Sequence, residues 1–198
     1  MQKYGNAITG DTDHLYKRLK NSMERADKID IIVSFLMESG VRLILSDLKT
    51  AQQRGSSIRI LTGNYLHITQ PSALYLLRKE LGEELDLRFY SESKRSFHLK
   101  AYLFHYVEQE KEYNEIYIGS SNISYSALTS AIKWDFRFNQ NENPEAYAEF
   151  QKAFEYLFEQ KAKRITEEVL WEYARSWKQP NAMKDLKKYE SDAIRKKF

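Results

Sequence analysis

The stretch that decides the fold is Ile29-Asp30-Ile31-Ile32-Val33-Ser34-Phe35, because a short and almost continuous apolar run is typical of a buried strand. Apolar residues then recur at intervals of three and four positions, which predicts an amphipathic helix ended by Gly55; they are Val41, Ile44, Leu45 and Leu48. A second apolar run, residues 58–61, follows. Strand, helix and strand in this order predict two parallel strands with the helix packed on the sheet.

The alternation of helix and strand continues on both sides of this unit. Asp11-Thr12-Asp13 can cap a helix that runs to about Ala26, and residues 72–81 have the pattern of a short helix. Residues 85–90 have the pattern of a third strand. Such an alternation is typical of an α/β protein. We therefore expect a mixed, mostly parallel sheet flanked by helices on both faces.

The second half of the chain has a different pattern. Residues 99–107 and 116–118 are predicted strands, and the charged loop 108–114 between them predicts a hairpin. One or two helical turns are expected over residues 124–130 and a further strand over residues 132–138. From Pro144 onward the pattern is helical. We expect one domain over residues 1–160, followed over residues 161–198 by a helical extension or the start of a linker.

The composition is that of a folded domain. The 198 residues are 42% hydrophobic and 30% charged, contain no cysteine and carry a formal net charge of +3. The absence of cysteine excludes disulfides, thiol catalysis and thiolate metal sites. No apolar run reaches the roughly 18 residues of a membrane span. We therefore expect a cytoplasmic protein without a membrane partner.

Positive charge is concentrated at the end of the sequence. Residues 178–198 hold seven Lys or Arg and three acidic residues, so this segment carries a net +4 and the rest of the chain a net −1. Residues 1–177 therefore offer no general basic field for nucleic acid. A solvated terminal segment explains the basic cluster better than a dedicated phosphate contact.

Two short motifs carry the chemistry, Phe97-His98-Leu99-Lys100 and Gly119-Ser120-Ser121-Asn122. Each lies beside a predicted strand, and two residues of a strand that are two positions apart, such as His98 and Lys100, point to the same face. A neutral imidazole can attack a phosphodiester and form a phosphohistidine that water later releases. Lys100 would bind the phosphate oxygens, and Ser120 and Asn122 would add hydrogen-bond donors. The sequence therefore predicts a phosphodiester site that requires no metal.

The pattern H-x-K followed by G-S-x-N resembles the phospholipase D superfamily. The flanking sequence is similar to the phospholipase D-like nuclease domains found at the N-terminus of some bacterial DEAD/DEAH-box helicases; the similar segments are residues 34–40, 58–66, 69–74 and 119–128. Residues 1–160 are accordingly identified as a phospholipase D-like domain. The resemblance implies a metal-independent phosphodiesterase or nuclease that acts on nucleic acid, DNA above all. It also implies that residues 161–198 lead toward a helicase region, to which any ATP and Mg²⁺ would belong, whereas this domain itself needs no cofactor.

Members of the superfamily bring two such motifs together across a pseudo-two-fold axis. This sequence has one H-x-K, since His14, His67 and His105 are each followed two positions later by a residue other than lysine. The resemblance therefore implies a homodimer in which His98 of one subunit is the nucleophile. The copy of His98 in the other subunit would then be the general acid.

One position departs from the family pattern. Related nucleases place a Glu eleven residues after the Asn, where it orients the histidine, and this sequence has Lys133 there. A cation beside His98 disfavours the imidazolium form, and Asp135, on the same strand face, is the alternative partner of the histidine. Two functions therefore stay open. One is an enzyme of the phospholipase D type; the other is a catalytically degenerate module that binds phosphate or nucleic acid and dimerises, with Lys133 as a phosphate contact.

Further expectations concern the surroundings of the site. The resemblance implies that Arg59 and Tyr65 border the site and that Ser121 contacts substrate beside Lys133. The three tryptophans are interpreted as packing residues rather than base-stacking platforms; they are Trp134, Trp171 and Trp177. A lipid phosphodiesterase and a purely structural dimerisation domain are the rival functions, and the first would need an apolar membrane-binding surface.

Overall fold

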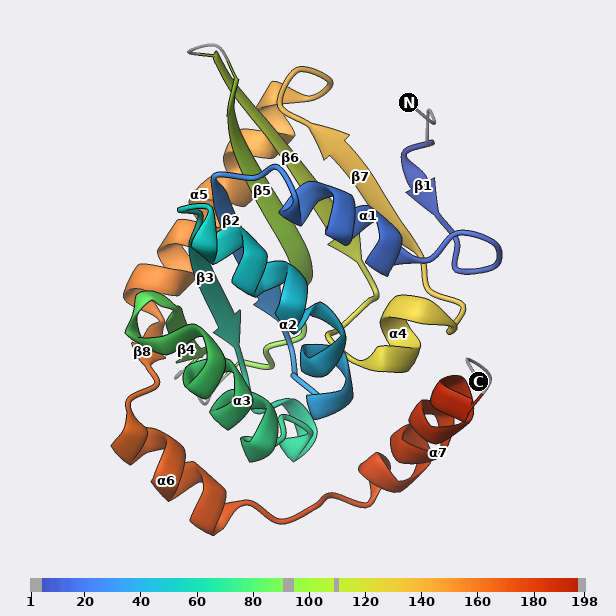
Figure 1. Ribbon diagram of the computed structural model, residues 1–198, viewed down its shortest axis with the longest axis vertical. Helices are drawn as coiled ribbons and strands as arrows, with labels where there is room; N and C mark the ends of the chain where they lie inside the picture. Colours follow the sequence, from blue (N-terminus) through green and yellow to red (C-terminus); the bar gives the residue numbers. More distant parts are fainter. Residues whose placement is uncertain (1–4, 91–94, 109–110, 196–198) are drawn as a thin grey trace.

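The computed structural model describes residues 5–90, 95–108 and 111–195 (Figure 1). Over these ranges the chain forms one eight-stranded sheet in the order β1-β7-β6-β5-β2-β3-β4-β8. The strands are β1 (Ala7–Ile8), β2 (Lys28–Val33), β3 (Ser57–Thr62), β4 (Asp86–Tyr90), β5 (Lys100–Glu108), β6 (Lys111–Gly119), β7 (Asp135–Asn139) and β8 (Ala162–Arg164). The helices are α1 (Leu15–Met23), α2 (Glu38–Gln53), α3 (Pro71–Leu81), α4 (Tyr125–Thr129), α5 (Pro144–Gln160), α6 (Glu167–Ser176) and α7 (Ala182–Arg195), with 3₁₀ turns η1 (Tyr65–His67) and η2 (Gly82–Glu84).

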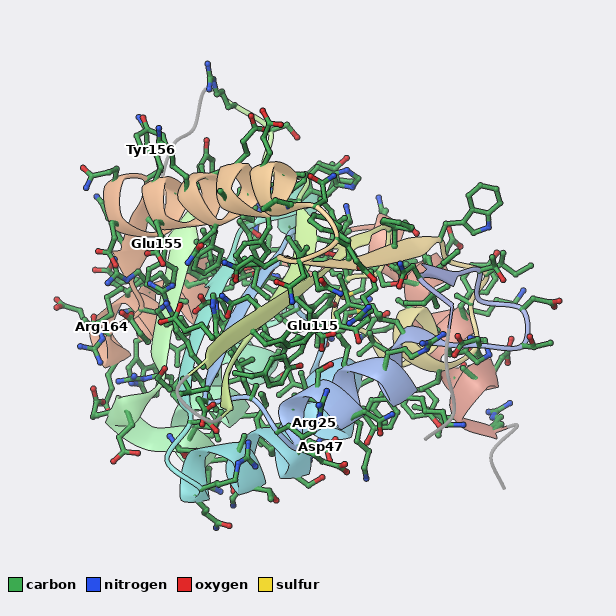
Figure 2. All side chains as sticks on the ribbon, turned by 90° about the horizontal axis from the view of Figure 1, so that it is seen from above. Arg25, Asp47, Glu115, Glu155, Tyr156 and Arg164 are labelled. Atoms are coloured by element: carbon green, nitrogen blue, oxygen red, sulfur yellow. The ribbon has the colours of Figure 1, made fainter. Side chains whose placement is uncertain are left out.

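Helices cover both faces of the sheet, as the sequence predicts. On one face α5 contributes Phe154 and Phe158 to a core shared with Leu61 and Leu103 of the sheet. On the other face α1, α2, α3 and α6 pack into a larger core. Figure 2 shows the sheet between α5 on one side and α1 and α2 on the other. None of the helices in the described ranges is long and apolar enough to cross a membrane.

The side chains of β2 alternate between these two cores, as the two-residue period of a strand requires. Ile29, Ile31 and Val33 belong to the larger core, and Ile32 belongs to the smaller one. Because both faces of the strand are covered, its sequence is almost continuously apolar. Its one acidic residue, Asp30, is buried and paired with Arg59.

The α/β class and the mixed sheet are confirmed, with one correction: antiparallel pairs outnumber parallel ones. Parallel pairing joins β2 to β3 and β3 to β4. The pairs β1–β7, β2–β5, β4–β8, β5–β6 and β6–β7 are antiparallel. The alternating helices and strands of the first half produce the parallel pairs. The β5–β6 hairpin then reverses the chain, and β7 runs back beside β6.

Several boundaries differ from the predicted ones. Helix α1 begins at Leu15, with His14 as an N-cap that makes no side-chain bond. The carboxylate of Asp13 does not cap the helix and accepts a hydrogen bond from Arg18 at 3.0 Å. The predicted hairpin is confirmed with a shorter loop, since β6 already begins at Lys111 and residues 109–110 lie outside the described ranges. Strand β7 begins at Asp135 and not at residue 132. The edge strands β1 and β8, of two and three residues, are too short to leave a sequence pattern.

The helical C-terminal segment is confirmed and packs against the rest of the chain. Strand β8 pairs with β4, α6 contacts α3, and α7 contacts α4. Met183, in the first turn of α7, is buried together with Met37 and Ile68. Figure 1 shows this segment running along one edge of the molecule from α6 to α7. Residues 196–198 at its end lie outside the described ranges.

Candidate active site

The two sequence motifs meet at one edge of the sheet. Strands β2 and β3 end there, at Val33 and Thr62, and Lys100 at the start of β5 pairs with Val33. Strand β6 ends at Gly119, opposite Asp135 at the start of β7. The edge at which parallel strands end is where α/β proteins commonly place their binding sites.

His98 lies two positions before the first residue of β5 and is exposed to solvent. The ring of Tyr65, in the 3₁₀ turn after β3, lies against it with the ring centroids 4.5 Å apart and the planes at 42°. Lys100 donates a hydrogen bond from Nζ to the carbonyl oxygen of His98 at 3.2 Å. The structure therefore brings these three predicted residues together.

Basic groups converge at this edge. Lys100 is 8% exposed, and burial together with the charge of Lys133 lowers its pKa to about 8. Partial loss of hydration beside its neighbours also lowers the pKa of the exposed His98, and the charges of Lys100 and Lys133 lower it further. The neutral imidazole, which is the nucleophilic form, is therefore favoured. Repulsion among the basic groups is relieved when an anion binds between them, so the arrangement suits a phosphate.

The side chain of Asn122 is oriented by the end of β2. Its Oδ1 accepts hydrogen bonds from the main-chain N–H groups of Ser34 at 3.0 Å and Phe35 at 3.3 Å. Two N–H donors require the oxygen on that side, so the amide Nδ2 points the other way. Within the described part of the chain Nδ2 has no hydrogen-bond partner. It can therefore donate to a bound phosphate.

Ser34 is a site residue that the motifs do not reveal. Besides its main-chain bond to Asn122, its hydroxyl donates to the carbonyl oxygen of Leu99 at 3.2 Å. It thereby ties the His98 segment to the Asn122 segment. The one signal in the sequence is a polar residue at the end of a buried apolar strand, which is also where α/β sites form.

Asp135, Ser121 and Ser120 hold the second motif in place and are not joined to His98. Asp135 is buried, and its carboxylate accepts from the hydroxyl of Ser121 at 2.6 Å and from its main-chain N–H at 3.2 Å. The hydroxyl of Ser120 accepts from the N–H of Trp134 at 3.1 Å and lies 3.2 Å from its carbonyl oxygen. Asp135 thus holds the motif of residues 119–122 in place and is not hydrogen-bonded to the imidazole of His98. Among the described residues no three His, Asp or Glu side chains come together as metal ligands would.

Arg59 does not border the site. Its guanidinium donates to Asp30 at 2.6 and 2.7 Å and to Glu155 of α5 at 2.6 and 2.9 Å. The register pairs Arg59 with Asp30, three positions before β3 reaches the site edge at Thr62. In Figure 2 the labelled Glu155 lies on the sheet side of α5 and Tyr156 on the opposite side. Arg59 is therefore part of an ion-pair network between the sheet and α5.

Large apolar side chains are exposed around the site. They are Leu66, Leu99, Ile132 and Trp134, each adjacent to or within a segment that holds a site residue. Trp134 is 74% exposed and Trp171, on α6, is 69% exposed. The interpretation of these two tryptophans as packing residues is wrong, whereas Trp177 does pack, with Met37, Ile68 and Met183. Sequence pattern alone does not separate an apolar residue of the core from one of an interface.

Known families and structures share this fold. The family model described as "Cardiolipin synthase, PLD-like domain" matches residues 15–158. Comparison with curated protein sequences gives no match. NucT from Helicobacter pylori is 14% identical, with a TM-score of 0.56 over 75% of this chain and 89% of NucT. Nuc from Salmonella typhimurium, a phospholipase D family member, is 14% identical with a TM-score of 0.56 over 80% of this chain and 97% of Nuc. Polyphosphate kinase from Porphyromonas gingivalis is 12% identical with a TM-score of 0.61 over 84% of this chain and 24% of the kinase.

These structures show a common fold, because identities this low do not carry a substrate from one protein to another. The family match is evidence for membership of the family, since it spans most of the chain and its range includes His98, Lys100 and Asn122. The same residues converge at the sheet edge described above. On the family match and this geometry, the chain belongs to the phospholipase D-like family.

Proposed function

We propose that this protein is a metal-independent phosphodiesterase that acts on nucleic acid, with His98 as the nucleophile. The observation that carries the proposal is the convergence of four groups at one sheet edge: the imidazole of His98, the amines of Lys100 and Lys133, and the amide of Asn122. Burial and two cations favour the neutral imidazole, which attacks phosphorus. The amines and the amide donate to the non-bridging oxygens, where negative charge increases in the transition state.

The reaction has two steps. A ring nitrogen of His98 uses its lone pair to bond phosphorus, the bond from phosphorus to the leaving oxygen breaks, and a protonated imidazole gives that oxygen a proton. Water then attacks the phosphohistidine and gives a proton to the imidazole that acted as the acid. The P–N bond breaks, and His98 returns to its neutral form. Lys100 and Asn122 stabilise the charge on the phosphoryl oxygens in both steps.

The acid in this scheme is the second copy of His98 in a homodimer. The exposed apolar side chains Leu66, Leu99, Ile132 and Trp134 support the proposal, because they lie in the segments at the site edge. A two-fold axis through this edge would cover them and bring the two imidazoles together. The variant with Ile132→Asp and Trp134→Asp is expected to be a monomer in light scattering and inactive, whereas Trp171→Asp stays a dimer. A wild type that is a monomer at all concentrations would contradict the dimer.

We propose that the nucleic acid is DNA and that this domain is the N-terminal part of a helicase. The support for both is the resemblance of residues 34–40 and 119–128 to helicase-associated nuclease domains. ATP and Mg²⁺ would then bind in a helicase region and not at His98. A cytoplasmic location fits this context.

The experiment that tests the reaction is cleavage in the presence of EDTA. Bis(p-nitrophenyl) phosphate and single- and double-stranded DNA are incubated with the wild type, with His98→Ala and with His14→Ala. His14 is the matched control, because it is a histidine outside the H-x-K motif whose Nδ1 has no hydrogen-bond partner among the described residues. We expect the wild type and His14→Ala to cleave and His98→Ala to be inactive. Cleavage that persists in His98→Ala would exclude this histidine as the nucleophile.

The site also supports a second function, phosphate or nucleic-acid binding without turnover. Lys133 favours it, because a cation at this position lowers the pKa of His98 and makes the imidazolium acid scarce. Among the described residues no carboxylate is hydrogen-bonded to the ring of His98. If the wild type binds DNA and does not cleave it, Lys133→Glu separates a decayed enzyme from a dedicated binding module: cleavage returns in the first case only. Loss of DNA binding in His98→Ala would distinguish this module from a purely structural dimerisation domain.

A further inference from the structure

The segment that follows the family match runs past the site. We call residues 167–195, which comprise α6, α7 and their connection, the C-terminal strap. The family match ends earlier, at residue 158. Figure 1 shows the strap passing along the edge of the molecule from α6 beside α3 to α7 beside α4. It forms hydrogen bonds with the loop that carries Tyr65 and with the start of α4, which follows the Asn122 motif.

The first segment is the loop of residues 63–69, which carries Tyr65. Two of its non-glycine residues have left-handed backbone angles, with φ of 51° at Leu66 and 58° at His67. Such residues are strained and keep this conformation only where their surroundings impose it. Within the loop the hydroxyl of Thr69 donates to the carbonyl oxygen of Gly63 at 2.5 Å, which fixes the two ends.

The middle of the loop has two hydrogen bonds of its own, from the N–H of His67 to the carbonyl oxygen of Asn64 and from the N–H of Ile68 to that of Tyr65. The strap adds further bonds. The indole N–H of Trp177 donates to the carbonyl oxygen of His67, one of the strained residues, at 2.8 Å. The hydroxyl of Tyr173 lies 2.7 Å from the carbonyl oxygen of Thr69 and 2.9 Å from Oδ1 of Asn64. Trp177 is also packed with Met37, Ile68 and Met183, so its position is set by apolar contacts. The strap therefore contacts the residues on both sides of Tyr65.

The conformation of the loop affects His98 through the side chain of Tyr65. The ring of Tyr65 lies against that of His98 with a centroid distance of 4.5 Å. Burial is the largest cause of the lowered pKa of His98. No described residue is hydrogen-bonded to the imidazole, so the contact with Tyr65 is the one described ring contact that limits its rotation.

The second segment is the start of α4, which follows the Asn122 motif. Glu190 of α7 is buried, and its carboxylate accepts from the main-chain N–H groups of Tyr125 at 3.0 Å and Ser126 at 2.8 Å. It also accepts from the hydroxyl of Ser39 on α2. An acidic group at the N-terminus of a helix satisfies free N–H donors and stabilises the helix. The strap is thereby anchored at both of its ends.

We propose that Tyr173 and Trp177 are positioning residues for His98, which act by holding the loop of residues 63–69 and, through it, the ring of Tyr65. The inference rests on the proposed function of His98 and adds to it a part of the chain outside the family match. Neither residue touches the reacting atoms. Their effect is on the orientation and the solvent exposure of the imidazole.

The test removes the hydrogen-bonding group of one strap residue at a time and keeps an aromatic ring at that position. Trp177→Phe and Tyr173→Phe lose the donors to the loop. Trp171→Phe and Tyr189→Phe are the matched controls, because Trp171 and Tyr189 are exposed residues of the same strap. For bis(p-nitrophenyl) phosphate we expect kcat to fall roughly tenfold in the first pair with KM little changed, since misorientation of a reacting group acts on the chemical step. The controls should match the wild type.

A second measurement does not depend on cleavage. The ring protons of His98 are followed by NMR through a pH titration, and the pKa of His98 should rise toward its ordinary value in Trp177→Phe, because a released loop leaves the ring more hydrated. Tyr65→Ala should give the same rise. Trp177→Phe added to Tyr65→Ala should give no further rise, because both changes act through the same contact.

The two readouts separate this inference from the proposed function. If the wild type does not cleave in EDTA but the titration of His98 moves in the strap variants, the proposed reaction fails and the positioning role holds. If the titrations and kcat of Trp177→Phe and Tyr173→Phe both equal those of the controls, the positioning role is overturned. If Trp177→Phe shifts the pKa of His98 further when Tyr65→Ala is already present, the strap does not act through Tyr65.

Discussion

Ser34 and Asn122 are joined by a hydrogen bond of 3.0 Å, in which the main-chain N–H at the end of β2 donates to the side-chain oxygen of the asparagine. The hydroxyl of the same Ser34 donates to Leu99, beside His98. His98 and Asn122 are 24 positions apart in the sequence. Ser34 thus links the two motifs, in addition to the pairing of β5 with β6, and the amide of Asn122 is oriented before any ligand binds.

This orientation predicts different effects for two substitutions of Asn122. Asn122→Asp keeps an acceptor for the N–H groups of Ser34 and Phe35, so the fold should be retained. Its second carboxylate oxygen replaces the amide donor and repels a phosphate. We expect the affinity for inorganic phosphate, measured by calorimetry, to fall by at least roughly tenfold, the value of a hydrogen bond to a charged group. Asn122→Ala should lose both affinity and thermal stability. Unchanged phosphate affinity in Asn122→Asp would show that the amide does not face the ligand.

The pKa shifts at the site predict a bell-shaped pH profile. His98 attacks in its neutral form, and its pKa lies below 6.5, so the rate should fall only at more acid pH. Lys100 binds phosphate as a cation, and its pKa of about 8 means that this charge is lost as the pH rises through that value. A p-nitrophenolate leaves without needing a proton, so the protonated imidazole of the second subunit does not limit this substrate. We expect kcat/KM for bis(p-nitrophenyl) phosphate to be highest between these limits. In Lys100→Arg the alkaline limb should disappear, because arginine stays charged. An alkaline limb that persists there would exclude Lys100 as its source.

Lys133 should control both of these pKa values. It lowers the pKa of His98 and of Lys100 by charge repulsion, in each case after the larger effect of burial. Lys133→Gln removes this repulsion and should raise both pKa values, and Lys133→Glu should raise them further by attraction. NMR titration of His98 measures the effect. Lys152→Gln, an exposed lysine of α5, is the control and should leave the titration unchanged.

The local pattern of the sequence predicts most of the fold because each strong pattern has a local cause. The runs at β2 and β3 are apolar since both faces of those strands are buried, and the three- and four-residue spacing of α2 matches the side that packs on the sheet. The direction of the later strands has no such local cause. Antiparallel pairing of β5 with β2 depends on the whole topology, and a strand of two residues such as β1 carries no periodicity.

The sequence predicts the site residues that belong to a motif. It does not predict the residues whose orientation depends on a hydrogen bond to a side chain far away in the sequence. His98, Lys100 and Asn122 lie together because β5 begins and β6 ends at the same edge of the sheet. Ser121 and Asp135 point to each other, and Arg59 to Asp30 and Glu155, so the structure does not direct these side chains at the phosphate position as expected. Tyr173 and Trp177 belong to a segment more than 100 positions from the loop that they hold, which no local pattern reveals.

Arg59 should therefore matter for stability and not for catalysis. Burial alone would raise the pKa of Asp30, but hydrogen bonds from Arg59 and His105 lower it, so Asp30 is a charged group that is 1% exposed. Arg59→Leu leaves this charge without its main partner, which costs about 3 kcal/mol. Urea unfolding at neutral pH measures the loss. Asp30→Asn in the same chain should recover part of it, because the buried charge is gone.

The pH dependence of this variant gives a sharper test. A carboxyl group whose pKa is lowered by folding stabilises the native state above its unfolded pKa, and this contribution is lost as the pH falls through the folded pKa. The difference in the free energy of unfolding between Arg59→Leu and the wild type should thus be largest at neutral pH. It should shrink in acid, where Asp30 is protonated in both proteins. The kcat of the folded fraction should equal that of the wild type. A folded, stable Arg59→Leu with lower substrate affinity would instead assign Arg59 to the binding site.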